Sequence, residues 1–279
     1  KDALALGFGE ANIRKIANDA EFRLSLPDLE AALESDVQAG KIPCCIVPTI
    51  GATPTASIDP VADMIALARR YGCWVHIDAA YAGPVALLDE KSWVFQGWEQ
   101  ADSIVLNPHK WMFVNVDASV LYIRRKDQLS DAIGLTPEYL KTKTDPRMLN
   151  YMDYSISLGR RFRALKLWMT LRYYGREGIA NLIRSHIEMA GRLKDQVAAD
   201  PRFEVVAPVH FGLVCFRMKD SNEKNQKLMD TLNASGFAFL SHTVQNGQYV
   251  LRFSIGNWMT TQQDVDQTWE RIQKVATEL

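Results

Sequence analysis

A histidine and a lysine stand side by side at positions 109 and 110, within the segment LNPHKWMF. Proline, tryptophan, methionine and phenylalanine flank them, which is an apolar setting for two basic groups. An amine that such neighbours desolvate holds its proton less tightly and becomes a nucleophile toward carbonyl groups. The segment therefore predicts a reactive amine at Lys110, although a single lysine is most often a solvated loop charge.

A carboxylate is the second candidate group. In WVHIDAAY (residues 74–81), strand alternation places His76, Asp78 and Ala80 on one face. An aspartate at the end of a buried strand is costly unless a cation or a hydrogen-bond donor meets it. Because Lys110 follows the later strand SIVLN, a parallel sheet would bring it to the same edge as Asp78. The alternatives are a plain salt bridge between the two residues, or an aspartate that caps a helix.

A lysine and an aspartate on one sheet edge match the needs of pyridoxal phosphate chemistry. The lysine can form a Schiff base with the aldehyde, and the carboxylate can keep the pyridine nitrogen protonated. Ala80 is small enough for a ring to lie against the strand, and Asn107 and His109 offer polar groups for phosphate or substrate. Each feature is weak by itself, and their combination favours a pyridoxal phosphate site.

The elements that must position these groups alternate along the first two-thirds of the chain. Helices are predicted over residues 27–40, which begin with Pro27, and 59–72, where Asp59 is the expected N-cap. Apolar strands are predicted over 41–51, 73–81, 102–107 and 118–124, and the first has no clean alternation, as in a strand buried on both faces. This order predicts an α/β fold with a mainly parallel sheet between helices.

The pattern changes after the last of these strands. Residues 134–158 are rich in turn formers and polar residues, which predicts a mobile loop that acts as a lid. A helix is predicted over 160–175. We assign residues 1–178 to a large domain and residues 179–279 to a smaller α+β domain.

Two local signals support the α+β assignment of the second part. The pair Asn246-Gly247 stands between alternating segments, as in a two-residue hairpin turn. The last helix is preceded by TQQD (residues 261–264), a capping box, and carries Val265 and Trp269 on one face.

Composition excludes several classes of function. The 279 residues carry a net charge of −1 and have no long basic run, which argues against nucleic-acid binding. There is no apolar stretch of the roughly 18 residues that span a bilayer, and no secretory signal is visible. The cysteines and the histidines outside the motifs show no metal-binding spacing: Cys44, Cys45, Cys73, Cys215, His186, His210, His242. We therefore expect a reduced, cytoplasmic protein without metal. The absence of a G-x-S-x-G elbow argues against a serine hydrolase.

Three segments, in this order and spacing, resemble the group II pyridoxal-phosphate-dependent amino-acid decarboxylases: HIDAAYAGPVALL, NPHKWMFVNVDAS and LGRRFRALKLW. The likeness is greatest to aromatic-L-amino-acid decarboxylases and covers essentially the whole chain. It implies fold type I, as in aspartate aminotransferase. It also implies roles for single residues: Lys110 would form the Schiff base, and Asp78 would be the partner of the pyridine nitrogen. Ala80 and Thr49 would contact the ring, and Asn107 and His109 would contact the phosphate and the lysine. Tyr151, in the irregular loop, would be the proton donor.

The resemblance further implies an intertwined homodimer with active sites at the subunit interface. In this family, a histidine that stacks on the cofactor and serines that hold its phosphate lie upstream of the segment that matches residue 1. The chain opens on KDALAL, as if inside a helix. We therefore expect that an N-terminal segment belongs to the site, either in the same polypeptide or as a separate fragment.

The leading hypothesis is decarboxylation of an aromatic L-amino acid (tyrosine, DOPA, tryptophan or phenylalanine) to its amine. Histidine or glutamate as substrate, or an aldehyde product, stay open, although a tyrosine at 151 favours the amine. An aminotransferase would need an arginine for the substrate carboxylate, for which Arg252 is a candidate. A non-catalytic half is the remaining alternative. Tyr173 stands where plant relatives carry a small residue, and it either narrows the substrate pocket or packs in the core.

Overall fold

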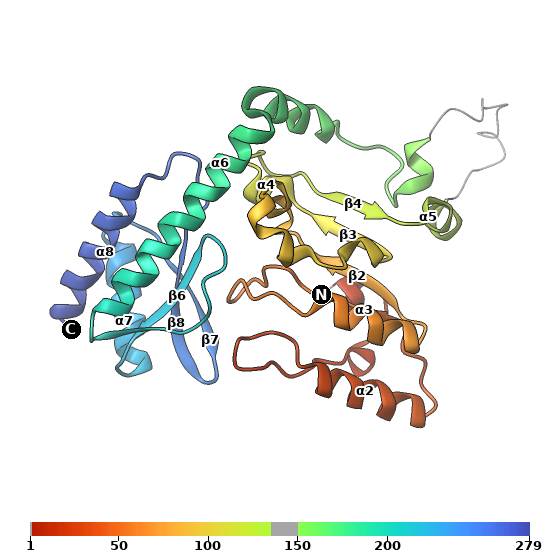
Figure 1. The fold of residues 1–279 in the computed structure, drawn as a ribbon, viewed down its shortest axis with the longest axis horizontal. Coiled ribbons are helices and arrows are strands. Elements are labelled where there is room, and N and C mark those ends of the chain that lie inside the picture. Colours follow the sequence, from red (N-terminus) through yellow and green to blue (C-terminus); the bar gives the residue numbers. More distant parts are fainter. Residues whose placement is uncertain (1, 135–149) are drawn as a thin grey trace.

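A computed structural model describes residues 2–134 and 150–279. It contains two four-stranded sheets, and α6 runs from the first toward the second (Figure 1). The helices are α1 Asp2–Ala5, α2 Leu26–Gln38, α3 Val61–Arg70, α4 Pro108–Trp111, α5 Lys126–Ile133, α6 Arg163–Ala199, α7 Asn222–Ala234 and α8 Gln262–Thr277. Short 3₁₀ helices are η1 Glu10–Asn12, η2 Gly83–Leu87, η3 Asp89–Phe95, η4 Trp98–Gln100 and η6 Tyr151–Tyr154.

The first sheet has the order β1-β2-β3-β4. Its strands are β1 Cys45–Ile46, β2 Trp74–Asp78, β3 Ser103–Leu106 and β4 Val120–Ile123. The pairs β1–β2 and β2–β3 are parallel, and β4 runs antiparallel to β3. The predicted, mainly parallel sheet is therefore confirmed, with one antiparallel strand at its edge.

The two faces of β2 in this sheet differ in burial. On β2, Val75 and Ile77 are fully buried in the main core, whereas His76 and Asp78 on the other face are partly exposed. The prediction that the 41–51 strand is buried on both faces is wrong in this chain: only two of its residues form β1, and Cys45 is exposed while Ile46 is buried. An apolar run cannot say which of its faces finds a partner.

The helix starts follow the predictions with one exception. The Ser25 hydroxyl caps α2 by accepting the N–H of Asp28. Asp59, the expected N-cap of α3, does not cap that helix, whose N-cap is Pro60. The Asp59 carboxylate instead accepts the backbone N–H groups of Leu24 and Thr49, each at 2.8 Å. Long-range contact thus prevails over the local cap.

The helix predicted over 160–175 continues well beyond it. α6 has 37 residues and bends at Gly175, whose φ of 66° and ψ of 177° are not helical. Glycine adopts this conformation because it has no Cβ. The glycine therefore redirects the helix instead of ending it.

The second sheet is antiparallel, in the order β5-β6-β8-β7, with strands β5 Phe203–Val205, β6 Leu213–Met218, β7 Ser241–Gln245 and β8 Gln248–Ser254. Asn246 and Gly247 form the predicted hairpin turn, with φ of 51° and 77°. Thr261 and Asp264 form the predicted capping box of α8. A second hydrophobic core lies between this sheet and its helices.

Candidate active site

The carboxyl ends of the parallel strands bring four of the predicted cofactor residues together through the backbone. Thr49 pairs with Asp78 as an isolated parallel bridge, next to which the Ile50 N–H donates to the Asp78 carbonyl at 2.9 Å. Beyond β3, the Asn107 N–H donates to the Ala80 carbonyl at 3.1 Å. Thr49, Asp78, Ala80 and Asn107 therefore share one edge of the sheet, as predicted.

The Asp78 carboxylate lies on the face of β2 that points away from the core. One of its oxygens, Oδ1, accepts the N–H of Ala80 at 3.0 Å. This bond fixes the carboxylate close to Ala80, whose own side chain is buried. The Asp78 carboxylate is thus held next to the small side chain of Ala80.

Lys110 lies on α4, the single helical turn that follows β3. Its N–H donates to the Asn107 carbonyl at 2.9 Å. Pro108 and Trp111 are buried, but Lys110 itself is exposed. The prediction that its apolar neighbours desolvate the amine is therefore wrong for this chain. Successive side chains on a helix point about 100° apart, so Trp111 enters the core while Lys110 faces the open side.

Asn107 and His109 are held by the segment that leads into β4. The Ser119 hydroxyl donates to Asn107 Oδ1 at 2.7 Å. His109 Nδ1 lies 2.5 Å from the Ala118 carbonyl oxygen and 3.1 Å from the Ala118 nitrogen. Both side chains are thereby tied to residues 118–119, which orients them beside the Lys110 turn.

Tyr151 lies far from this group within the chain. Because β4 is antiparallel to β3, it leads the chain back to the amino-terminal ends of the parallel strands, and α5 begins there. Tyr151 is in η6, which packs against α5, and it is 69% exposed. Figure 1 shows α4 and α5 at opposite ends of β3 and β4. The four residues of β3 alone span about 13 Å. Most of the predicted loop at 134–158 lies outside the described residues.

Arg252 on β8 bonds to the neighbouring strand β7 and to the loop at residues 53–54 of the first half. Its guanidinium donates to the carbonyls of Pro54 and Thr53, at 2.9 and 2.6 Å, and to the Ser241 hydroxyl at 2.7 Å. These bonds give it a structural role, which weakens the aminotransferase alternative. Tyr173 is 82% exposed, so the core-packing alternative for that residue is wrong in this chain.

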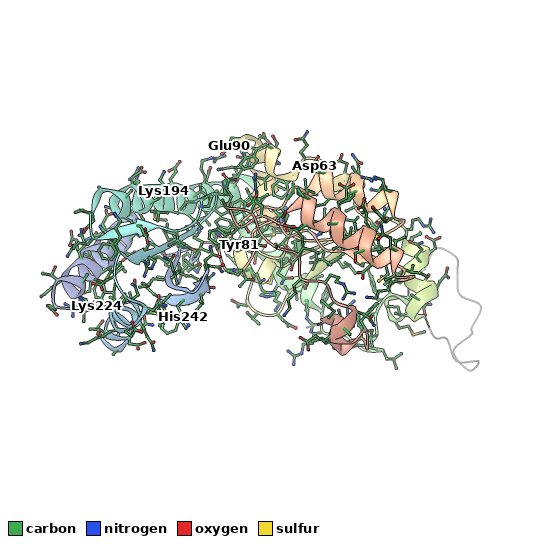
Figure 2. The ribbon with its side chains drawn as sticks, turned by 90° about the horizontal axis from the view of Figure 1, so that it is seen from below. Asp63, Tyr81, Glu90, Lys194, Lys224 and His242 are labelled. Carbon is green, nitrogen blue, oxygen red and sulfur yellow. The ribbon has the colours of Figure 1, made fainter. Side chains whose placement is uncertain are left out.

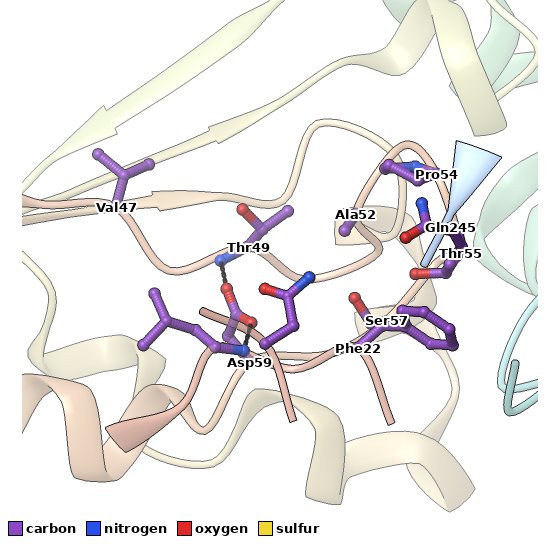
Figure 3. Close-up of a pocket in the computed structure, with 11 residues that line it drawn as sticks. Phe22, Val47, Thr49, Ala52, Pro54, Thr55, Ser57, Asp59 and Gln245 are labelled. Carbon is purple, nitrogen blue, oxygen red and sulfur yellow. Dashed lines mark hydrogen bonds between the residues drawn. The ribbon is translucent and has the colours of Figure 1, made fainter. Parts of the chain in front are cut away.

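Asp59 is a residue near the site that the sequence analysis misassigned. It lines a cavity of about 230 Å³ together with Thr49 and Ser57, and Figure 3 shows its bond to the backbone of Thr49. Burial raises the pKa of this carboxyl. The cavity shares only Thr49 with the predicted cofactor residues, so we regard Asp59 as a support for that strand end.

Neither a metal-binding cluster nor a membrane-spanning helix occurs among the described residues. Among residues 2–134 and 150–279, no group of three His, Cys, Asp or Glu side chains could hold a metal ion. None of the helices described for this chain combines the length and the apolarity that crossing a membrane requires.

The sequence of this chain matches a known protein family. Residues 1–219 match the model for the pyridoxal-dependent decarboxylase conserved domain. The chain belongs to the pyridoxal-dependent decarboxylase family. The matched residues include the whole first sheet, α4, and the strands β5 and β6 of the second sheet.

Individual relatives narrow the similarity. The sequence is 41% identical to tyrosine decarboxylase 2 of Arabidopsis thaliana over 99% of this chain, and 39% identical to a phenylacetaldehyde synthase of the same plant over 98% of this chain. A crystal structure of Oryza sativa TDC with PLP and tryptamine superposes with a TM-score of 0.95, at 37% identity and over 99% of this chain. The chain spans 53%, 58% and 59% of the lengths of these three proteins, respectively.

Proposed function

We propose that this protein binds pyridoxal phosphate through Lys110 and decarboxylates an aromatic L-amino acid to its amine and carbon dioxide. The observation that carries the proposal is the hydrogen bond from Asn107 to Ala80, which brings the Lys110 turn to the sheet edge that holds Asp78. Membership of the decarboxylase family and similarity to a tyrosine decarboxylase support the reaction and the substrate class.

The residues on this edge fit the cofactor. Lys110 is exposed, so its amine is accessible to an aldehyde, and Asp78 keeps one carboxylate oxygen that Ala80 does not use. Lys110 would hold the cofactor covalently, Asp78 would hold a proton on the pyridine nitrogen, and Ala80 and Thr49 would contact the ring. Asn107 and His109 would orient the phosphate and the lysine. The bound cofactor supplies a ring that accepts the electron pair left when carbon dioxide departs.

The test is borohydride reduction of the protein, at the length in which it is made, after incubation with pyridoxal phosphate. We expect a reduced cofactor adduct on the peptide that contains Lys110 and none in Lys110→Ala, which should also lose turnover by several orders of magnitude. Release of carbon dioxide from tyrosine, DOPA, tryptophan and phenylalanine then identifies the substrate. An unmodified Lys110 in excess cofactor contradicts the proposal.

A second candidate product is supported by one comparison. Because a phenylacetaldehyde synthase is 39% identical, aldehyde formation is the alternative outcome on the same residues. A tyrosine at position 151 favours the amine, since it can return a proton to the substrate carbon. Equal amounts of amine and carbon dioxide without oxygen uptake would support the amine. Oxygen uptake with aldehyde, ammonia and hydrogen peroxide would support the alternative.

We also propose that the protein acts as a homodimer in which Tyr151 serves the site of the other subunit. Tyr151 lies at the sheet edge opposite Lys110, so another copy would have to bring the two together. The first half of α6 and the preceding segment carry many exposed large apolar side chains, as expected of a surface that is buried on assembly: Ile156, Leu158, Phe162, Leu165, Trp168, Met169, Leu171, Tyr173.

Subunit mixing tests this arrangement. Lys110→Ala and Tyr151→Phe chains are each defective in amine formation, and they are unfolded and refolded together. If Tyr151 acts across the interface, mixed dimers contain one intact site, and an equal mixture recovers about a quarter of the wild-type activity. No recovery in dimers that have mixed would show that both residues act within one chain.

The location and the domain boundary are part of the proposal. All four cysteines are unpaired, which suits a reducing compartment such as the cytoplasm. The division into residues 1–178 and 179–279 stays a prediction; limited proteolysis near residue 178 would test it.

A further inference from the structure

Lys110 and Asp78 are each followed by an aromatic residue, Trp111 buried and Tyr81 partly buried, and the two rings stack on each other. Tyr81 lies three positions after Asp78, and Trp111 lies directly after Lys110. Their ring centroids are 4.7 Å apart and their planes are 8° from parallel. Stacking of this kind resists sliding and tilting, because both change the ring contacts. The stacked rings of Tyr81 and Trp111, on the core side of the site, therefore fix the position of the Lys110 turn relative to β2.

A histidine holds the edge of the tryptophan. Trp111 is fully buried, and its indole N–H donates to Nδ1 of His186 at 3.0 Å. The two rings are 3° from parallel with centroids 6.3 Å apart, an alignment that suits an in-plane hydrogen bond. His186 is 1% exposed and lies on α6, 76 residues after Lys110 in the sequence.

The contacts of His186 determine its tautomer. Nδ1 accepts the indole proton, so Nδ1 carries no proton of its own. Nε2 must then carry the ring proton, and it lies 3.1 Å from the Asn257 carbonyl, to which it donates. Burial lowers the pKa of His186, which keeps the ring neutral and the acceptor available. A protonated ring would place two donors against each other at Trp111.

The C-terminal part of the chain closes the other side of this aromatic pair. A methyl group on Gly212 would stand 3.1 Å from the Trp111 indole and 3.4 Å from the Tyr81 hydroxyl. It would also lie 2.4 Å from the Ile255 carbonyl, so only glycine fits. Figure 2 shows Tyr81 near the middle of the molecule, between the two halves. The rings behind the site are thus held from both halves.

We propose that His186 is a positioning residue for Lys110: its Nδ1 holds the Trp111 indole, and through it the helical turn that presents the lysine amine to the cofactor. The inference rests on the proposed function, because it assigns a role toward pyridoxal phosphate. His186 does not contact the reacting atoms. It acts through the adjacent tryptophan and links residue 257 of the second half to the Lys110 turn.

Three substitutions separate the two hydrogen bonds of the histidine. In His186→Asn the side-chain oxygen lies near the position of Nδ1 and can still accept from Trp111. In His186→Gln the amide lies near the position of Nε2 and can still donate to Asn257, but it leaves the indole without its acceptor. Trp111→Phe keeps the buried ring and removes the donor.

The measurements are the dissociation constant of pyridoxal phosphate, from its visible absorption band, and the melting temperature of the cofactor-free protein. We expect His186→Gln and Trp111→Phe to weaken cofactor binding about tenfold, which corresponds to one lost hydrogen bond. His186→Asn should recover most of that loss. The double variant His186→Gln/Trp111→Phe should be no weaker than either single variant, because both remove the same bond.

A matched control separates positioning from stability. Asn225 is a buried polar residue of the second half that bonds to the backbone of Met218, away from the Lys110 turn. Asn225→Ala should lower the melting temperature and leave cofactor binding unchanged. The inference is overturned if cofactor affinity follows the melting temperature in all variants, or if His186→Gln binds the cofactor as the wild type does. If the wild type itself forms no adduct at Lys110, the proposed function fails instead.

Discussion

The two sheets of this chain differ in how completely they are covered. All six residues of β6 in the second sheet are buried, and its core includes aromatic contacts among Phe203, Phe216 and Trp269. In the first sheet, β4 has two residues, Leu121 and Tyr122, that are about half exposed. The sheet that presents the chemical groups is the less covered one.

The well-covered second sheet contributes mainly to stability, whereas the less covered first sheet carries the chemical groups. In the second sheet, β6 is buried on both faces, one against α6, α7 and α8 and the other in the main core, so this burial gains its free energy within the chain. In the first sheet, the face of β2 that carries His76 and Asp78 is partly open. Parallel strands are normally covered on both faces, so the open face is expected to be covered on assembly. Substitutions should therefore affect folding mainly in one sheet and assembly mainly in the other.

The largest effect on folding is expected from Phe216→Ala. Phe216 is fully buried and lies 5.8 Å from Trp269, centroid to centroid. Removing the ring leaves a cavity, so the free energy of unfolding should fall by about 3–5 kcal/mol. Urea unfolding followed by tryptophan fluorescence measures the change. A loss below about 1 kcal/mol would mean that the second sheet is less tightly packed than its burial indicates.

The next effect is expected where the two sheets meet. Arg252→Met keeps the apolar stem but removes the bonds to the carbonyls of Thr53 and Pro54. Hydrogen bonds from a charged donor contribute about 1.5–3 kcal/mol, so unfolding should become easier by that amount. Under the proposed function, the KM for the amino acid should change little. A large rise in KM with unchanged stability would instead support an arginine that holds the substrate carboxylate.

Two aspartate–arginine pairs of similar length compare the two halves of the chain. Asp200 contacts Arg202 at 2.6 Å and is 8% exposed, whereas the side chain of Asp117 contacts Arg163 at 2.7 Å and is 49% exposed. The hydrogen bond from Arg202 holds the pKa of Asp200 well below its usual range, and that from Arg163 lowers the pKa of Asp117 to about 2. Asp200→Asn should cost about 1–2 kcal/mol at pH 7, and Asp117→Asn should leave the unfolding midpoint unchanged.

The pH dependence of Asp200 gives the sign of its contribution. Because its pKa is lower in the folded protein than in the unfolded chain, the unfolded chain takes up the proton first as the pH falls. The stabilisation is present above about pH 4 and is lost as the pH drops toward the folded pKa. The difference between wild type and Asp200→Asn should therefore shrink below pH 4. A constant difference down to pH 2 would exclude ionisation as its cause.

The smallest effect on folding is expected on the open face. Leu121→Thr replaces a half-exposed side chain on β4 and should change the free energy of unfolding by less than about 0.5 kcal/mol. If this face is buried on assembly, the same variant should shift the oligomer toward smaller species in analytical ultracentrifugation. An unchanged oligomer would show that Leu121 lies outside the interface.

Much of the site could be predicted from local sequence. The order of strands and helices placed Asp78 and the segment that holds Asn107 and Lys110 at one edge, because the carboxyl ends of parallel strands coincide, and the family resemblance added Thr49. The hairpin turn and the capping box were also predictable, since each depends on residues within a few positions. The exposure of Lys110 was not, because it depends on which side of a single helical turn meets the core.

The sequence by itself determined the chemical groups, their order and the type of most elements, because periodicity, caps and turn residues act over short distances. Only the tertiary structure decided that Asp59 supports Thr49 instead of capping α3, that Tyr151 lies across the sheet from Lys110, and that His186 meets Trp111. Asp59 and Thr49 are 10 positions apart in the sequence, and His186 and Trp111 are 75 apart, yet both pairs are in contact. Tyr151 and Lys110 are 41 positions apart and lie at opposite ends of the strands. Such pairings depend on how strands order and helices pack, which no local pattern encodes.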